Sequence, residues 1–194
     1  MRNVLLVTWL LLPIGAWAYH EGPGQDRLAL DATDAVLVDA HQAALDGRWP
    51  SAVRGFEEAL AKLPKDQDAV ARRLRLELNK ARMQAKGLGT AREELETLVD
   101  ELVEDKNADP QLLGEARQAL ARSQFFSTWL MRLEGVAREE WEPEIEAARQ
   151  NWRLLAEQAG SPAAKEQHEK DLEASIRLAR LDIEDLQGLP LPSE

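Results

Sequence analysis

The stretch ALDGRWPSAVRGFEEALAKLP, residues 44–64, decides the fold that the sequence predicts. Gly47 ends one helical segment, and Pro50 suits the first turn of the next. Apolar residues then recur at intervals of three and four, which places on one helical face Ala52, Val53, Phe56, Ala59, Leu60 and Leu63. Pro64 ends this second helix. The stretch therefore predicts a helix, a tight turn and an amphipathic helix.

The same pattern of apolar helices separated by glycine or proline continues along the chain. Helices are expected over residues 34–45, 50–63, 68–86, 90–104, 110–134, 143–158 and 162–187, with Thr90 as a cap and 136–142 as a connector. Their expected inward residues include Leu45, Val70, Leu130 and Leu133. Period-two runs of Val, Ile and Thr are missing, so no strand is expected. The sequence predicts an all-α fold of about three helix pairs and a C-terminal capping helix.

The first pair resembles a tetratricopeptide (TPR) repeat. The residues that carry the resemblance are the turn residues Gly47 and Trp49, followed in the usual frame by Ala52, Phe56, Ala59 and Pro64. This resemblance implies a right-handed solenoid of helical hairpins that binds a protein or peptide. Exported bacterial TPR proteins are typically scaffolds in envelope assemblies. A helical bundle of another kind is the alternative.

The charge and the composition narrow the classes of partner. The 194 residues include 35 acidic and 24 basic side chains, for a formal net charge of −11. Nucleic acid and anionic membrane surfaces are therefore poor partners for the surface as a whole. Without cysteine, the chain has no disulfide, catalytic thiol or cysteine metal site.

Residues 1–18 have the three parts of a secretory signal peptide. Arg2 is followed by an apolar run from Val4 to Leu12, and Ala16 and Ala18 form an exit site for cleavage after Ala18. An uncleaved membrane anchor is the alternative, although the run is short for a spanning helix. We expect a flexible lead-in over 19–33, one helical domain over 34–187 and an extended tail over 188–194.

A basic stripe is predicted on the third helix. Its members share one helical face, because they recur at intervals of three and four: Arg72, Arg75, Asn79, Arg82 and Lys86. Arg binds carboxylates through two parallel hydrogen bonds, so the stripe is a candidate site for a partner's carboxylate or acidic segment. The TPR resemblance implies that Arg75 and Asn79 form half of a carboxylate clamp. A solvated face, or pairing with the Glu-rich helix that follows, is the alternative.

A second candidate site is the turn where Trp129, Arg132 and Trp141 gather with several glutamates. Trp and Arg are favoured in binding hot spots, so the segment is a candidate docking edge. The alternative is structural: Trp141 fixes the start of the next helix, and the acidic residues lie at its positive N-terminal end.

No cofactor, metal site or catalytic machinery is expected. His41 falls on the apolar side of its helix, His168 on an exposed side, and His20 near the cleavage site, and none belongs to a carboxylate–His cluster. Nucleophile-elbow, phosphate-loop and dinucleotide motifs are missing. The sequence favours a non-catalytic periplasmic or envelope scaffold for a protein partner. A helical small-ligand carrier or enzyme subunit, and a self-associating structural protein, are the alternatives.

Overall fold

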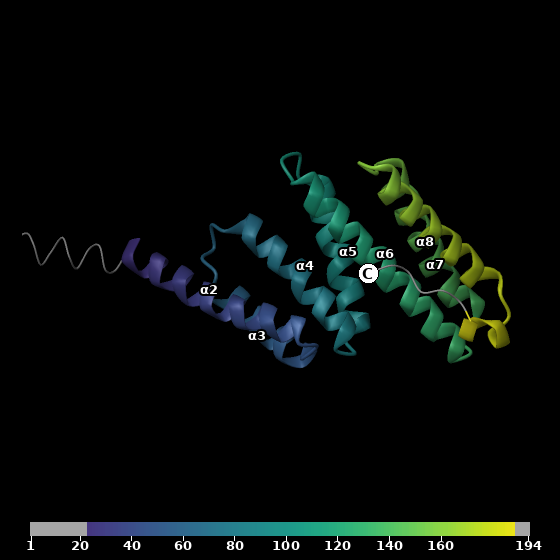
Figure 1. Ribbon diagram of the computed structural model, residues 1–194, viewed down its shortest axis with the longest axis horizontal. Coiled ribbons are helices and arrows are strands. Elements are labelled where there is room, and N and C mark those ends of the chain that lie inside the picture. The colour runs from purple at the N-terminus through teal and green to yellow at the C-terminus, as the bar shows by residue number, and fades with distance from the viewer. Residues whose placement is uncertain (1–22, 189–194) are drawn as a thin grey trace, which may run out of the picture. The chain divides into compact units, whose positions relative to one another are not determined.

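The structure is a computed structural model that describes residues 23–188, in which every regular element is a helix (Figure 1). The all-α prediction is confirmed for this range. The α-helices are α2 (Pro23–Leu45), α3 (Trp49–Lys62), α4 (Asp68–Gln84), α5 (Leu88–Glu104), α6 (Pro110–Leu133), α7 (Arg138–Glu157) and α8 (Pro162–Arg180), followed by the 3-10 helix η1 (Ile183–Gly188). The proposed signal peptide, with Ala16 and Ala18, lies outside the described residues, as does the tail beyond residue 188.

The chain divides into two compact units. The N-terminal unit ends at Leu74, and the C-terminal unit begins at Arg75, so the boundary falls within α4. The hairpin of α2 and α3 belongs to the first unit. The second unit contains the end of α4 and all later helices.

The first helix begins earlier than the sequence analysis predicted. It starts at Pro23 rather than Asp34, so most of the expected lead-in is helical. Proline is favoured in a first helical turn, and the residues that follow, Arg27-Leu28-Ala29-Leu30, have high helix propensity. The prediction gave too much weight to Gly22 and Gly24 as breakers. The predicted cap Thr90 is also wrong, because α5 begins at Leu88 with Gly87 as its N-cap residue.

The expected connector before Pro143 is also mostly helical. Helix α7 begins at Arg138 and contains Pro143 inside it. Proline removes one backbone hydrogen bond and crowds the carbonyl four residues earlier, here that of the exposed Glu139. Burial of Trp141 and the acidic first-turn residues Glu139 and Glu140 favour the helix on the N-terminal side of the proline.

The last helix is shorter than predicted. Helix α8 ends at Arg180 instead of continuing to Gln187, and the chain then turns through Leu181 into η1. The Arg132 side chain donates hydrogen bonds to the backbone oxygens of Leu178 and Leu181 at this break. These two carbonyls therefore have a partner although the helix stops. Leu186 of η1 is buried, which anchors the new direction of the chain.

Small residues bring α2 and α3 together in the N-terminal unit. Gly47 has φ +69°, a conformation that L side chains rarely adopt, and turns the chain between the helices. A Cβ atom placed on Gly55 would lie 2.7 Å from the Cβ of Ala40, so only glycine fits there without a shift. Ala43 is buried and Leu45 is 82% exposed, which corrects the predicted inward position of Leu45. Val70, on the part of α4 in this unit, is exposed too, so its predicted inward position is also wrong.

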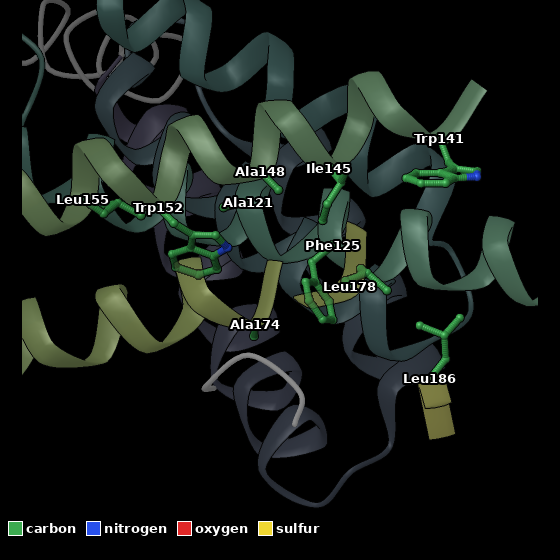
Figure 2. Close-up of a cluster of buried hydrophobic side chains, with 10 residues drawn as sticks. All are labelled: Ala121, Phe125, Trp141, Ile145, Ala148, Trp152, Leu155, Ala174, Leu178 and Leu186. Carbon is green, nitrogen blue, oxygen red and sulfur yellow. The ribbon is translucent and has the colours of Figure 1, made fainter. Parts of the chain in front are cut away.

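Two hydrophobic clusters form the core of the C-terminal unit. The first joins α4, α5 and the N-terminal half of α6, and includes Leu76, Leu95, Leu98 and Leu120. The second joins the C-terminal half of α6 to α7, α8 and η1, and Figure 2 shows its buried side chains, with Trp152 of α7 directed towards α8. Helix α6 contributes to both clusters and so connects the two halves of the unit.

Helices of the C-terminal unit also contact their second neighbours along the chain. Lys80 of α4 lies 3.7 Å from the carboxylate of Glu115 on α6. Arg92 of α5 lies 3.1 Å from that of Glu144 on α7. Arg132 connects α6 to the end of α8. Contacts therefore join α4 to α6, α6 to α8, and α5 to α7.

Candidate functional site

The predicted basic stripe on α4 is largely occupied by the protein's own side chains. The Nη1 atom of Arg75 donates to the Glu101 carboxylate at 2.6 Å, and its Nη2 atom lies 4.0 Å from Glu94. Asn79 is 1% exposed; its amide nitrogen donates to the Arg75 backbone oxygen at 2.9 Å, and its amide oxygen accepts from Arg82 at 3.2 Å. The alternative of pairing with the Glu-rich helix is thus confirmed for Arg75.

The two ends of the stripe differ from its middle. Arg72 is half-buried, while Lys86 is exposed and lies beyond the last residue of α4. Lys86 has φ +68°, and the Gly87 amide donates to the Arg82 backbone oxygen at 2.8 Å, an arrangement typical of a helix C-terminus. Lys86 therefore departs from the helical face that the spacing assigned to it. A partner's carboxylate at Arg75 would compete with Glu101.

The predicted docking edge is mostly internal. Arg132 and Trp141 are both buried, and the Arg132 guanidinium lies 4.8 Å from the centre of the Trp141 ring. Burial lowers the pKa of Arg132 and Asp182 partly opposes this effect, but a guanidinium stays charged at neutral pH. This geometry fits the structural alternative, in which Trp141 fixes the start of α7.

The exposed part of this region lies instead on α6. Phe126, Trp129, Leu130 and Leu133 are spaced at i, i+3, i+4 and i+7, and we call them the α6 apolar surface. Leu130 is 42% exposed and Leu133 41%, which corrects their predicted inward positions. Phe126 and Trp129 are half-buried against the second cluster. Of these four, Trp129 was predicted as a site residue and the other three were not, although their spacing is visible in the sequence.

The ion pair of Arg92 and Glu144 is more enclosed than that of Lys80 and Glu115. Burial raises the pKa of Glu144, and the Arg92 charge acts in the opposite direction. Within the described residues, one Glu144 oxygen is buried without a hydrogen-bond partner. The pair links α5 to α7 and offers little access to a partner.

The two described histidines, exposed His41 and half-buried His168, both contact other residues of the chain. His41 packs edge-on against Phe56, with ring centres 5.1 Å apart, and its Nδ1 atom lies 2.8 Å from the Leu37 backbone oxygen. His168 is half-buried rather than exposed as predicted, and it stacks on Trp152 with ring centres 5.9 Å apart. Burial lowers the pKa of His168, and the nearby Asp171 partly opposes this effect.

Residues 23–188 contain neither a metal-binding cluster nor a membrane-spanning helix. No group of three or more His, Asp or Glu side chains there is placed to hold a metal ion. No helix in the described part of the chain has the length and apolar character needed to cross a membrane.

No protein-family model matches the chain, and neither a curated protein nor a solved structure matches it.

Proposed function

We propose that the protein is a non-catalytic, exported scaffold of TPR-like helical hairpins that binds a protein partner in the cell envelope. One observation carries the proposal: in the C-terminal unit, helices contact both their neighbours and their second neighbours along the chain. The contacts between second neighbours are those of Lys80 with Glu115, Arg92 with Glu144, and Arg132 with the end of α8.

These contacts support an arrangement of the helices in two rows. One row holds α4, α6 and α8, and the other holds α5 and α7. Stacked hairpins bury their apolar faces against each other and leave one long face of each row in water. Such faces suit the binding of an extended partner better than they suit the enclosure of a small molecule.

We choose the partner-binding face by asking which side chains a partner can contact without breaking a contact within the protein. Arg75 is already paired with Glu101, so binding an acidic segment there requires breaking that contact. Leu130 and Leu133 are apolar and exposed, and burying them on binding is favourable. We therefore place the main contact on α6, with the basic stripe of α4 as the second choice.

Export is the part of the proposal that rests on residues 1–18, whose sequence resembles a signal peptide. Fusing those residues to an enzyme that is active only outside the cytoplasm tests it. Activity of the fusion, and its loss when Leu6 and Leu10 are changed to Asp, is the expected result. An inactive wild-type fusion would contradict export.

In-cell photo-crosslinking tests the scaffold function. A photoreactive amino acid is placed in the full chain at one solvent-facing position per helix: Gln111, Glu169, Glu96 or Arg153. A scaffold is expected to give one discrete adduct from positions in one row and none from the other row. If none of the four positions gives a discrete adduct, or all four give the same smear, the proposal is wrong.

A further inference from the structure

The α6 apolar surface is held in a fixed shape although part of it is in water. Phe126 and Trp129 pack against the second cluster on one side, while Leu130 and Leu133 stand out from the helix. A preformed surface loses little conformational freedom when a partner binds. The four side chains follow the spacing with which one helix contacts another helix or a peptide.

Four acidic side chains lie in the segments that meet at the C-terminal end of α6. Glu134 directly follows Leu133 in sequence, Asp182 lies at the break where Arg132 binds the end of α8, and Glu184 and Asp185 belong to η1, which packs on α6. All four carboxylates are exposed, and Asp182 acts on the charge of Arg132. Two basic side chains lie among them: Arg132 is buried and bonded to backbone oxygens, and Arg180, two residues before Asp182, is exposed. The four exposed carboxylates therefore outnumber the exposed arginine.

The exposed apolar side chains and the nearby carboxylates together indicate one class of binding partner. We propose that the α6 apolar surface binds a basic amphipathic segment of a partner protein, whose apolar side chains cover Leu130 and Leu133 and whose Lys or Arg side chains meet the four carboxylates. The proposal rests on the proposed scaffold function and names the partner's chemistry.

Electrostatic repulsion disfavours two other binding partners for this surface. A second copy of the chain carries the same acidic rim and a formal net charge of −11, so a symmetric contact on this surface would bring like charges together. An anionic membrane surface would be repelled by the same carboxylates. A basic segment gains from both the apolar contact and the charges.

The test measures calorimetric binding of two synthetic helical peptides to the full chain. One peptide contains Leu and Lys at amphipathic spacing, and the other replaces every Lys with Glu. We expect the Leu–Lys peptide to bind and the Leu–Glu peptide to bind at least about tenfold more weakly. Raising the salt concentration from about 0.05 M to 0.5 M should weaken the Leu–Lys binding several-fold, because exposed charges are screened.

Two variants locate the binding. Leu130→Glu/Leu133→Glu should weaken binding of the Leu–Lys peptide by at least about tenfold, since it removes the apolar contact. Glu134→Gln/Asp182→Asn/Glu184→Gln/Asp185→Asn should weaken it several-fold and flatten its salt dependence. The matched control is Val103→Glu, which changes another exposed apolar residue, 57% exposed, on α5. It should leave binding unchanged.

Several results would overturn the proposal. One is that the Leu–Lys and Leu–Glu peptides bind equally well. Another is that Val103→Glu weakens binding as much as Leu130→Glu/Leu133→Glu does. The third is that the wild-type chain forms a dimer, and that Leu130→Glu/Leu133→Glu makes it a monomer. Circular dichroism melting of each variant shows whether a loss of binding is a loss of folding. If peptide binding fails while crosslinking still finds a partner on another helix, the scaffold function stands and only this surface is wrong.

Discussion

The α2–α3 hairpin and the α6–α7–α8 region hold their helices together in different ways. In the hairpin, Gly55 passes so close to Ala40 that an added methyl group does not fit. In the C-terminal unit, Trp152, Phe125 and Ile145 fill the space between helices, and buried Arg132 fixes where α8 ends. The first contact depends on the absence of side chains, and the second depends on large side chains and on a long-range polar contact.

The largest effect is expected from removing Trp152, which is fully buried between α7 and α8. Trp152→Ala should lower the free energy of unfolding by about 3–5 kcal/mol, because it leaves a large cavity. Hydrogen–deuterium exchange should become faster in α7 and α8 and stay unchanged in α2 and α3. Phe56→Ala, which empties a buried site in the hairpin, is the matched control and should give the reverse pattern. If each variant accelerates exchange in all four of these helices, the hairpin and the α6–α7–α8 region are not stabilised separately.

The next largest effect concerns Arg132. Arg132→Met should lower the free energy of unfolding by about 2–4 kcal/mol, because two backbone oxygens at the end of α8 lose their donor. Chemical denaturation measures this change. Arg138→Met is the control: Arg138 also lies near the Trp141 ring, at 5.9 Å, but it is exposed, so little change is expected. An equal loss in both variants would mean that the contact with Trp141, rather than the carbonyl contacts, matters.

A smaller effect distinguishes the glycines of the two regions. Gly55→Ala should destabilise the protein by about 1–3 kcal/mol, because its methyl group meets Ala40. Gly114→Ala, in α6, should stabilise it by about 0.5–1 kcal/mol, because that position is open and alanine favours a helix. Thermal melting of the two variants tests the pair. A stabilising Gly55→Ala would show that the hairpin does not need its close approach.

The turn and the second helix of the hairpin were predictable from sequence, because their determinants are local, whereas the start of α2 at Pro23 was missed. Gly47, Pro50 and the spacing of Ala52, Phe56 and Ala59 lie within a short stretch, and α3 appears within one residue of the expected range. The helix limits around Pro143 and Arg180 were missed, since burial of Trp141 and the carbonyl contacts of Arg132 decide them. Those contacts join residues far apart in the chain, and local propensity carries no signal for them.

The candidate site residues also had some features that local spacing predicts and others that only long-range packing decides. The spacing correctly placed Arg75, Asn79 and Arg82 near one another on α4, but it could not tell that Asn79 is buried or that Glu101 pairs with Arg75. Similarly, Trp129, Arg132 and Trp141 were expected together, yet two of the three are internal. Which residues of an amphipathic helix face water depends on every helix packed around it. For a long helix such as α6, with partners on several sides, the apolar pattern alone leaves this open.

The smallest expected effect is a pH dependence at the stack of His168 on Trp152. Burial lowers the pKa of His168 in the folded state, and Asp171 opposes this only in part, so the unfolded chain binds the proton more readily. The stability from keeping this imidazole neutral is fully present above its ordinary pKa of about 6.5 and is lost as the pH falls towards the folded-state value. His168→Phe keeps an aromatic stack and removes the titration, so its melting temperature should fall less than the wild type's between pH 7 and pH 5. Equal slopes in the two proteins would show that His168 is as easily protonated in the fold as in water.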